Sequence, residues 1–334
     1  MLPWFQNGRF PLYLAPMAGF TDSVFRRLCR REGADVLVTE FVLADAVVRD
    51  RERTWETIAF TPDERPIGVQ IFGSSPAIMA EAARRISHRL GPDFVDLNFG
   101  CPAPKVTQRM AGCALLRDLP QMGRIARAVR RALSDTPLTA KIRIGWDERT
   151  VVAVDAARSL EDAGVEALAV HGRTREQGYR GDADWRVIED VVNAVGIPVI
   201  CNGGIGGDDQ SLMWIRNSGA RGAMVGRAAL GNPWIFSQIK NRIGECECDC
   251  TPSVENRLST LLHYAELLQA RPNSRVDSDS IRWMSPRLKA FMKDMAGASR
   301  FRRAIDSIRT MDELTKLCMN FPRDRGELAN LISA

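Results

Sequence analysis

Short apolar runs rich in Val, Ile and Leu recur along the first two thirds of the chain, and each is followed by a stretch with helical spacing. Runs without a polar face are typical of parallel strands that are buried on both sides and joined by helices. Eight such units within about 230 residues match a (β/α)8 TIM barrel, an α/β fold, better than an open doubly wound sheet. The eight runs cover residues 12–17, 36–41, 66–73, 94–100, 139–145, 167–172, 198–204 and 222–228.

The stretches between these runs carry the pattern of helices that pack on one face. Residues 75–90 place Ile78, Ala82 and Ile86 on one stripe, with arginines elsewhere. The segment between the second and third predicted strands is the least clear. Similar helical patterns cover residues 151–163, 184–195 and 208–218.

The strand rhythm stops after Phe236. Residues 244–253, GECECDCTPS, have the composition of a linker, and the segments that follow have helical spacing. A small helical bundle is the simplest interpretation of this second part. We therefore expect a barrel domain over residues 1–245 and a helical domain over residues 251–334. The expected helices cover residues 254–270, 281–296, 299–308 and 311–319.

Composition excludes several classes of protein. With 45% hydrophobic and 26% charged residues, the 334-residue chain has the average values of a globular protein and not those of a disordered or collagen-like chain. No window approaches the ~18 consecutive apolar residues that span a bilayer, and the N-terminus lacks the pattern of an export signal. We therefore expect a cytoplasmic protein with no membrane partner.

Eight cysteines in a chain without an export signal are expected to be thiols and not a disulfide framework. Cys246, Cys248 and Cys250 lie close together, but their spacing is not that of a structural zinc site, and we expect no metal. The net charge is only +5, and residues 251–334 carry most of the excess, with 14 Lys and Arg against 10 Asp and Glu. This asymmetry permits a nucleic-acid partner without establishing one.

Functional residues of a TIM barrel gather at the carboxyl ends of its strands. In this sequence those positions are rich in glycine and in polar side chains. Along the chain they are Pro16, Met17 and Ala18, then Gln70, Asn98, Cys101, Lys141, Arg143, His171 and Arg173, and finally Asn202, Gly203, Gly204, Gly226 and Arg227.

Glycines directly follow the seventh and eighth predicted strands. Without side chains at these positions, backbone N–H groups can approach a phosphate closely, as in many barrels of this class. Arg227 follows Gly226 and would add charge-assisted hydrogen bonds. The alternative is that the glycines only form tight turns. No GxGxxG motif follows the first strand, so the sequence does not support a resident Rossmann dinucleotide site.

Three further side chains are candidates for chemistry. Lys141 lies within the fifth predicted strand, where a buried ammonium needs an anion, either on a ligand or in an ion pair with Asp96 or Glu40. His171 is the one histidine at a strand end and is either a ligand contact or a core residue. Cys101 is able to donate a proton, attack as a nucleophile or fill space, and the residue pattern alone favours the last role.

At these positions the sequence resembles the tRNA-dihydrouridine synthases, flavoenzymes that reduce the C5=C6 bond of particular uridines in tRNA. The resemblance covers nearly the whole predicted barrel and, more loosely, the segment RWMSPRLKAFMKDM at 282–295. The segment GRAALGNPWIF favours the bacterial type similar to synthase B. The ordered motifs are APMAGFTDSVFRRL (15–28), VQIFG (69–73), DLNFGCPAPKV (96–106), AGCALL (111–116), KIRIGW (141–146), HGRTREQGYRG (171–181), PVICNGGI (198–205) and VGRAALGNPWIF (225–236).

The resemblance implies FMN bound in the barrel mouth, with NADPH or NADH as the reductant. It implies that Cys101 is the general acid, which protonates C5 on the face of the uracil opposite to the hydride delivered at C6. A thiol with the ordinary pKa of about 8.5 stays protonated at neutral pH and suits that role. The implied FMN contacts are Pro16, Met17, Ala18, Gln70, Lys141, His171, Asn202, Gly203, Gly204, Gly226 and Arg227.

The same resemblance implies a tRNA partner, whose target uridine is extruded into the barrel mouth. Arg282, Lys289 and Lys293 have spacings compatible with one helix face, which would form a basic platform for the RNA. We expect the protein to be a monomer. The implied tRNA contacts are Asn98, Arg143, Arg173 and Tyr179 at the barrel opening, and Arg282, Arg287, Lys289 and Lys293 in the helical domain.

Two other functions fit parts of the pattern. A flavin barrel that acts on free pyrimidines, of the dihydroorotate type, shares the cofactor and the hydride chemistry but does not need a basic helical domain. Tight and salt-dependent tRNA binding would separate the two. A barrel that binds RNA without catalysis would be colourless after purification, even when FMN is supplied.

Overall fold

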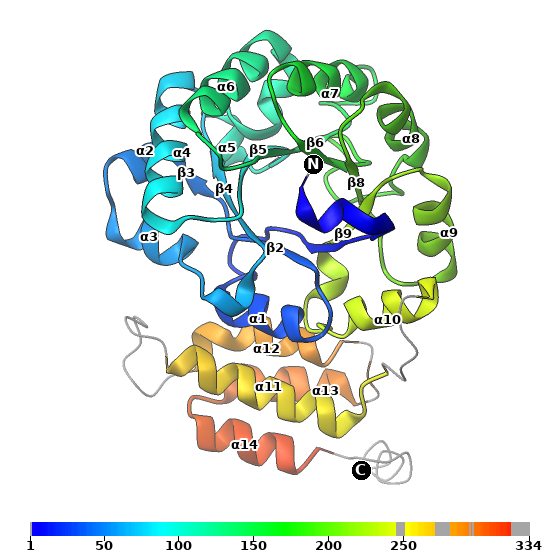
Figure 1. Ribbon diagram of the computed structural model, residues 1–334. Helices are drawn as coiled ribbons and strands as arrows, with labels where there is room; N and C mark the ends of the chain where they lie inside the picture. The colour runs from blue at the N-terminus through cyan, green and yellow to red at the C-terminus, as the bar shows by residue number, and fades with distance from the viewer. Residues whose placement is uncertain (1, 245–250, 271–280, 294, 296, 322–334) are drawn as a thin grey trace. The chain divides into compact units, whose positions relative to one another are not determined.

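A computed structural model describes residues 2–244, 251–270, 281–293, 295 and 297–321. The chain divides into two compact units, Met1–Gly226 and Arg227–Ala334 (Figure 1). Cys246, Cys248 and Cys250 lie outside the described residues. Within the described part of the chain, no helix is long and apolar enough to cross a membrane.

Eight parallel strands of the first unit close into a ring (Figure 1). They are β1 (Leu12–Leu14), β2 (Val36–Val38), β4 (Ile67–Phe72), β5 (Phe94–Phe99), β6 (Leu138–Arg143), β7 (Ala167–His171), β8 (Val199–Asn202) and β9 (Gly222–Val225). Each strand pairs with the next around the ring, which closes where Leu12 of β1 lies opposite Ala223 of β9. This closed parallel sheet confirms the predicted TIM barrel.

The second predicted strand is interrupted. The sequence predicts one strand over residues 36–41, but the ladder breaks after Val38 and resumes as β3 (Val42–Leu43), which pairs with β4 as β2 does. At the break, the Thr39 hydroxyl oxygen accepts a hydrogen bond from the N–H of Gln70 at 3.3 Å. A side-chain oxygen thus takes the place of a main-chain carbonyl in the ladder. For this reason the prediction of one continuous strand over residues 36–41 is wrong.

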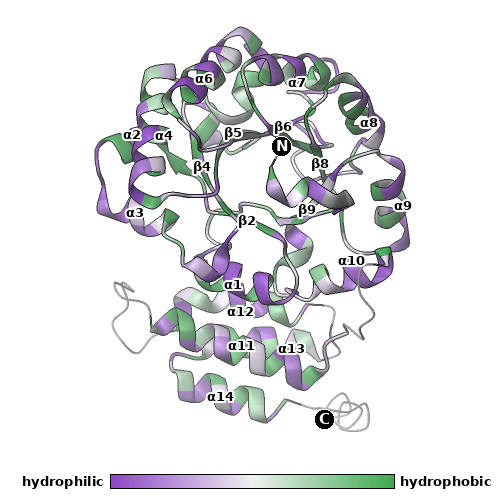
Figure 2. Ribbon diagram, in the orientation of Figure 1, coloured by the Kyte–Doolittle hydropathy of each residue, from purple (hydrophilic) through white to green (hydrophobic). Residues whose placement is uncertain are grey.

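Helices surround the ring of strands (Figure 1). In Figure 2 the strands are mainly hydrophobic, whereas the helices carry both kinds of residue, as elements with one buried face do. The helices are α1 (Ser23–Arg31), α2 (Ala44–Val48), α3 (Glu52–Ile58), α4 (Pro76–Leu90), α5 (Pro104–Thr107), α6 (Leu119–Ala132), α7 (Ala153–Asp162), α8 (Trp185–Ala194) and α9 (Asp209–Asn217), with 3-10 helices η1 (Pro3–Gly8), η2 (Pro62–Glu64) and η3 (Gly112–Arg117). Side chains that accept from backbone N–H groups begin α1, α4, α6, α8 and α9.

The segment around η1 closes one end of the barrel. Leu2 and Phe5 are buried in an apolar cluster with residues that point into the ring. The cluster includes Val36, Phe94 and Ala167, each of which is the first residue of its strand. Apolar side chains therefore fill the end where the strands start, and a ligand has to enter at the carboxyl ends.

The second unit is helical, as the sequence predicts. Its elements are η4 (Arg227–Ala229), α10 (Ile235–Ile243), α11 (Val254–Gln269), η5 (Arg282–Met284), α12 (Ser285–Phe291), α13 (Ala298–Ser307) and α14 (Met311–Met319). It starts ahead of the expected boundary because the chain after η4 packs on α12. A Cβ at Gly231 would lie only 2.0 Å from the carbonyl carbon of Ala290. The guanidinium of Arg257 on α11 also lies 5.6 Å over the ring of Trp234.

The helix predicted over residues 281–296 is wrong in its extent. The chain forms η5 and then α12, which ends at Phe291. Pro286 lies in the first turn of α12, where a residue without an N–H is tolerated, but it does not fit the interior of one continuous helix. Arg282, Lys289 and Lys293 therefore lie on three successive segments and do not share one helix face.

Candidate active site

Polar side chains gather at the carboxyl ends of the barrel strands. They are Gln70 on β4, Asn98 on β5, Lys141 and Arg143 on β6, His171 on β7 and Asn202 on β8. Lys141 is half-buried and the others are buried. These strands are successive neighbours in the ring, so the structure brings together residues that are far apart along the chain.

The loop after β1 is held by side chains at two points. The Thr21 hydroxyl oxygen accepts from the N–H of Met17 at 2.9 Å, and the Glu40 carboxylate accepts from the N–H of Gly19 at 2.9 Å. Gly19 has φ +84°, which glycine adopts without strain. These contacts fix the loop that carries Pro16, Met17 and Ala18.

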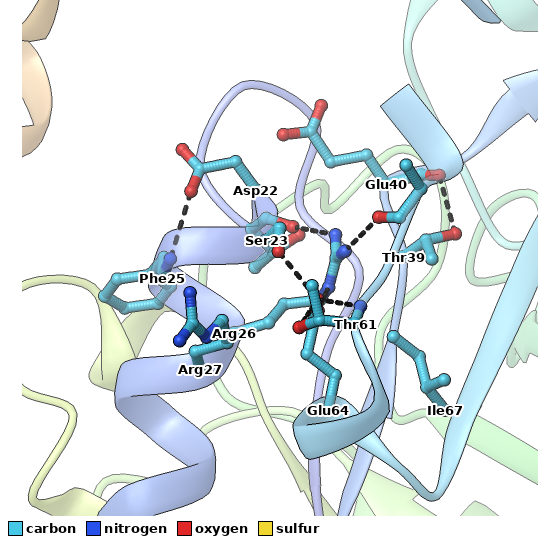
Figure 3. A network of polar contacts seen from close by, with 12 residues as sticks. Asp22, Ser23, Phe25, Arg26, Arg27, Thr39, Glu40, Thr61, Glu64 and Ile67 are labelled. Carbon is cyan, nitrogen blue, oxygen red and sulfur yellow. Dashed lines mark hydrogen bonds and ion pairs between the residues drawn. The ribbon is translucent and has the colours of Figure 1, made fainter. Parts of the chain in front are cut away.

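A fully buried ion pair supports the same loop (Figure 3). Arg26 and Glu64 have no solvent exposure, and Nε of Arg26 lies 2.6 Å from a Glu64 carboxylate oxygen. The other guanidinium nitrogens donate to the carbonyls of Thr21 and Ala59, at 2.9 and 2.8 Å. Glu64 also accepts from the Ser23 hydroxyl at 2.6 Å. Since a buried pair is stable only when its remaining polar atoms are bonded, this network joins α1, the first loop and η2 into one body.

A relay of buried hydrogen bonds runs from β6 to the loop after β5. Asp96 accepts from the Thr139 hydroxyl at 2.5 Å and from the side-chain nitrogen of Gln70 at 2.6 Å. The Gln70 oxygen accepts from the side-chain nitrogen of Asn98 at 2.8 Å. The Asn98 oxygen then accepts from the N–H groups of residues 100 and 101, at 3.1 and 2.9 Å. Two predicted site residues, Gln70 and Asn98, are therefore bonded to each other.

Cys101 lies in that loop and is half-buried. Gly112 approaches it so closely, with φ +60°, that a Cβ there would lie 2.7 Å from the Cys101 carbonyl oxygen. The N–H of Cys113 donates to the same oxygen at 3.2 Å. Burial raises the pKa of the Cys101 thiol, while the Ala103 N–H and the positive charge of Arg143 lower it. A thiol with a raised pKa is protonated at neutral pH.

Lys141 is held by an amide and not by a carboxylate. Its Nζ donates to Oδ1 of Asn202 at 2.9 Å. The ion pair with Asp96 or Glu40 that the sequence left open is thus not the contact that holds Lys141. Burial and, to a smaller extent, the charge of Arg143 lower the pKa of Lys141 to about 7, against an opposing effect of Asp96. A negative charge placed beside such a lysine stabilises its charged form and raises its pKa.

Arg143 is almost fully buried and binds main-chain carbonyls. Its Nε donates to Gly100 at 3.0 Å, and its Nη1 donates to Thr174 and Gly178 at 2.8 Å each. The guanidinium also lies 5.5 Å over the ring of Tyr179. These bonds tie the loop after β5 to the loop after β7, so Arg143 positions main chain at the site.

The glycines after β8 lie beside Arg173 and His171. Gly203 has φ +118°, and a Cβ there would lie 2.8 Å from Cδ2 of His171. Gly204 has φ +74°, and a Cβ there would have only Nη2 of Arg173 within 4.0 Å. A Cβ at Gly226 would meet its nearest atom at 3.8 Å. The main chain at Gly204 therefore borders open space with a guanidinium next to it, and a Cβ at Gly226 would make only ordinary van der Waals contacts.

The structure also groups Arg175, which the sequence places near the barrel opening, with two residues that the sequence analysis did not assign. Trp146 follows β6, and the guanidinium groups of Arg117 and Arg175 lie 5.1 and 4.7 Å from its ring centroid. The sequence signal was the aromatic residue that ends the motif KIRIGW. Its arginine partners come from distant segments, so no local pattern shows the group.

The predicted residues of the helical unit differ in their exposure. Arg227, Arg282 and Lys293 are exposed, and Arg287 and Lys289 are half-buried. The ammonium of Lys289 pairs with the carboxylate of Asp306, and this hydrogen bond lowers the pKa of Asp306. Part of the positive charge on this unit is therefore neutralised within it.

Comparison with known proteins gives the chain's relatives. A family model described as dihydrouridine synthase (Dus) matches residues 13–324. The tRNA-dihydrouridine synthase B of Pseudomonas aeruginosa is 43% identical over 258 residues, 77% of each chain. The tRNA-dihydrouridine synthase B of Xanthomonas axonopodis pv. citri is 37% identical over 309 residues, 92% of this chain and 91% of the relative. The solved structure of TcOYE with pHBA is similar in fold alone, with a TM-score of 0.51 and 11% identity over 70% of this chain and 91% of that one.

Replacing Glu64 by Gln tests the buried ion pair. The variant leaves the charge of Arg26 buried without its carboxylate, so the free energy of unfolding is expected to fall by about 3 kcal/mol. The neighbouring pair of Arg27 and Asp63 is the control, because its side chains are 32% and 52% exposed. Asp63→Asn is expected to cost less than about 1 kcal/mol. Chemical denaturation measures both losses, and equal losses would contradict the buried pair's structural role.

Proposed function

The chain belongs to the dihydrouridine synthase family, and from this we propose that it reduces the C5=C6 bond of a uridine in tRNA, with FMN as the bound cofactor and NADPH or NADH as the reductant. The observation that carries the proposal is the half-buried thiol of Cys101, which follows β5, next to the strand that carries Lys141, and whose pKa is raised by burial. Two relatives described above are named as synthases of type B, and we propose the same type here.

The glycines after β8 suit the phosphate of FMN. The main chain at Gly204 borders open space, and Nη2 of Arg173 lies beside it. Backbone N–H groups together with a guanidinium are a donor set that binds phosphate. We therefore assign Arg173 to the phosphate rather than to tRNA. The other proposed contacts at this end are His171, Asn202, Gly203, Gly226 and Arg227.

Gln70, Lys141 and the first loop would hold the flavin ring. When bound, reduced FMN supplies the hydride that is added at C6 of the uracil. Burial and the charge of Arg143 lower the pKa of Lys141 to about 7 despite the opposing effect of Asp96, so a further negative charge beside the ammonium would stabilise it. The electron-rich N1 and O2 edge of the flavin would provide that charge, and the ammonium would in turn stabilise it.

Cys101 would hold the proton that C5 receives. Its raised pKa keeps the thiol protonated at neutral pH. A general acid needs this protonated form, whereas a nucleophile needs the thiolate. The proton passes from Sγ to C5 and leaves a thiolate. The positive charges of Arg143, Lys105 and Lys141 lower the pKa of this thiol and so stabilise the thiolate once it has formed.

The substrate would be held at the barrel opening and on the helical unit. Tyr179 is 55% exposed and offers a ring on which an extruded base can stack. Asn98 and Arg143 would contribute mainly by holding the loops around that base. Arg282, Arg287, Lys289 and Lys293 would bind phosphates of the tRNA, although Lys289 must first leave Asp306.

Cys101→Ala tests the proposed acid. The variant is expected to keep its yellow flavin and its oxidation of NADPH, but to form dihydrouridine at least about 10²-fold more slowly, because a general acid contributes typically 10²–10⁴-fold. Mass spectrometry of digested tRNA measures the product. Cys113→Ala, which removes the neighbouring buried thiol, is the control and is expected to stay active. An unchanged yield from Cys101→Ala would remove Cys101 from this role.

Proton uptake on binding FMN tests Lys141. Without ligand its pKa is about 7, so at pH 8 most of the population is neutral, and the negative atoms of FMN should raise the pKa and draw a proton from solution. The uptake is expected to shrink towards pH 6, where Lys141 is already charged. Calorimetry in buffers of different ionisation enthalpy measures it. Lys141→Met is expected to abolish the uptake and Lys105→Met to leave it unchanged; equal uptake in all three proteins would contradict the assignment.

Neutralising Arg282, Arg287 and Lys293 together tests the RNA contacts of the helical unit. If each binds a phosphate, tRNA affinity should fall and the slope of log affinity against log salt should decrease by about 2 to 3. The control removes three exposed arginines from barrel helices, Arg124, Arg131 and Arg186, and so the same amount of charge. Reduction of the flavin by NADPH should be unaffected in both proteins. Similar tRNA affinities for the two variants would count against a dedicated surface on this unit.

A further inference from the structure

We propose that Asp96 is a positioning residue, which fixes the amide orientations of Gln70 and Asn98 and through them the main chain at Cys101. The inference rests on the proposed function for the role of Cys101. For the rest it depends on the relay of hydrogen bonds from Thr139 to the loop after β5.

The carboxylate sets the direction of this relay. The oxygen and nitrogen of a side-chain amide have nearly the same size. The shape of the surrounding protein therefore does not decide which of the two atoms of Gln70 faces Asp96. An ionised Asp96 only accepts, and it therefore faces the Gln70 nitrogen, at 2.6 Å. The Gln70 oxygen is then left facing Asn98, whose nitrogen donates to it at 2.8 Å.

The relay ends on the peptide group between Gly100 and Cys101. Because the nitrogen of Asn98 is already bonded, its oxygen faces the N–H of Cys101 and accepts at 2.9 Å. The carbonyl of the same peptide group accepts from Nε of Arg143 at 3.0 Å. Both polar atoms of this peptide are therefore held by buried side chains, and the thiol is attached to a fixed main chain.

Burial makes the orientation matter. The exposures of Gln70, Asp96, Asn98 and Thr139 are only 0%, 4%, 6% and 6%. An amide turned the wrong way would set donor against donor with no water to replace the lost bond, which costs more than an ordinary hydrogen bond contributes. Burial raises the pKa of Asp96 above its ordinary value, and its two hydrogen bonds and the charge of Lys141 limit that rise.

Amide hydrogen exchange at Gly100 and Cys101 tests the relay directly, in protein without tRNA or NADPH. Asp96→Leu keeps the branched shape of the side chain but removes the acceptor, so these two amides are expected to exchange about ten-fold faster. Thr139→Val is the matched control, because it removes the other donor to the same carboxylate and leaves the hydrogen bonds from Asp96 through Gln70 and Asn98 to Cys101 in place. It is expected to change the exchange less than about two-fold.

A double variant, Asp96→Asn with Gln70→Glu, provides the rescue. The new amide at position 96 is able to accept from Thr139 and donate to the new carboxylate at position 70, which still accepts from Asn98. The net charge is unchanged and the direction of the relay is kept. Exchange at Cys101 is therefore expected to return to within about threefold of the wild-type rate.

The outcomes separate the relay from simple packing and from the proposed reaction. Unchanged exchange in Asp96→Leu, or equal acceleration in Thr139→Val, would overturn the inference. If Asp96→Leu does not fold, the double variant decides, because an unprotected Cys101 amide there overturns the relay and a protected one supports it. Loss of dihydrouridine in Cys101→Ala together with a failed relay would leave the function standing. An intact relay in a protein that forms no dihydrouridine would leave the relay standing and contradict the proposed function.

Discussion

The site depends on closure of the barrel between β1 and β9, where Tyr13 lies opposite Met224. A closed ring of parallel strands has no free edge, and the inward side chains at all carboxyl ends face one space. The apolar cluster around Phe5 fills the opposite end. Polar residues from five successive strands, β4 to β8, therefore share a small volume, and each has to find its hydrogen-bond partner among the others or in a ligand.

The barrel could be predicted because burial on both faces of a strand leaves a local signature in the sequence. The positions of Gln70, Lys141 and Asn202 at strand ends followed as well, since chain direction determines which end of each run faces the site. The break at Thr39 and the early end of the predicted helix at Phe291 were not predicted. Both depend on which atom bonds to the main chain, and a pattern of hydrophobic residues does not record that choice. The roles toward FMN and tRNA come from the resemblance and stay predictions.

The sequence did not reveal which partner each buried polar residue takes. Arg26, Arg143 and Arg173 are of a residue type usually found at the surface, yet all three are buried and bind loop carbonyls. A guanidinium carries five donors, so one side chain satisfies several carbonyls where loops crowd together. Glu64 and Asp96 show the same dependence on distant partners, since the contacts that define them span 38 and 43 positions along the chain.

The apolar cluster at the start of the strands also affects the order in which the chain folds during synthesis. Leu2 and Phe5 are synthesised long before Ile200 and Met224, with which they share a cluster. Contacts between such distant residues form late. Bringing them together costs the conformational entropy of the chain between them before the contacts can stabilise the fold. Leu2 and Phe5 are thus covered late in folding. Until then their apolar surface is exposed, and exposed apolar surface favours aggregation.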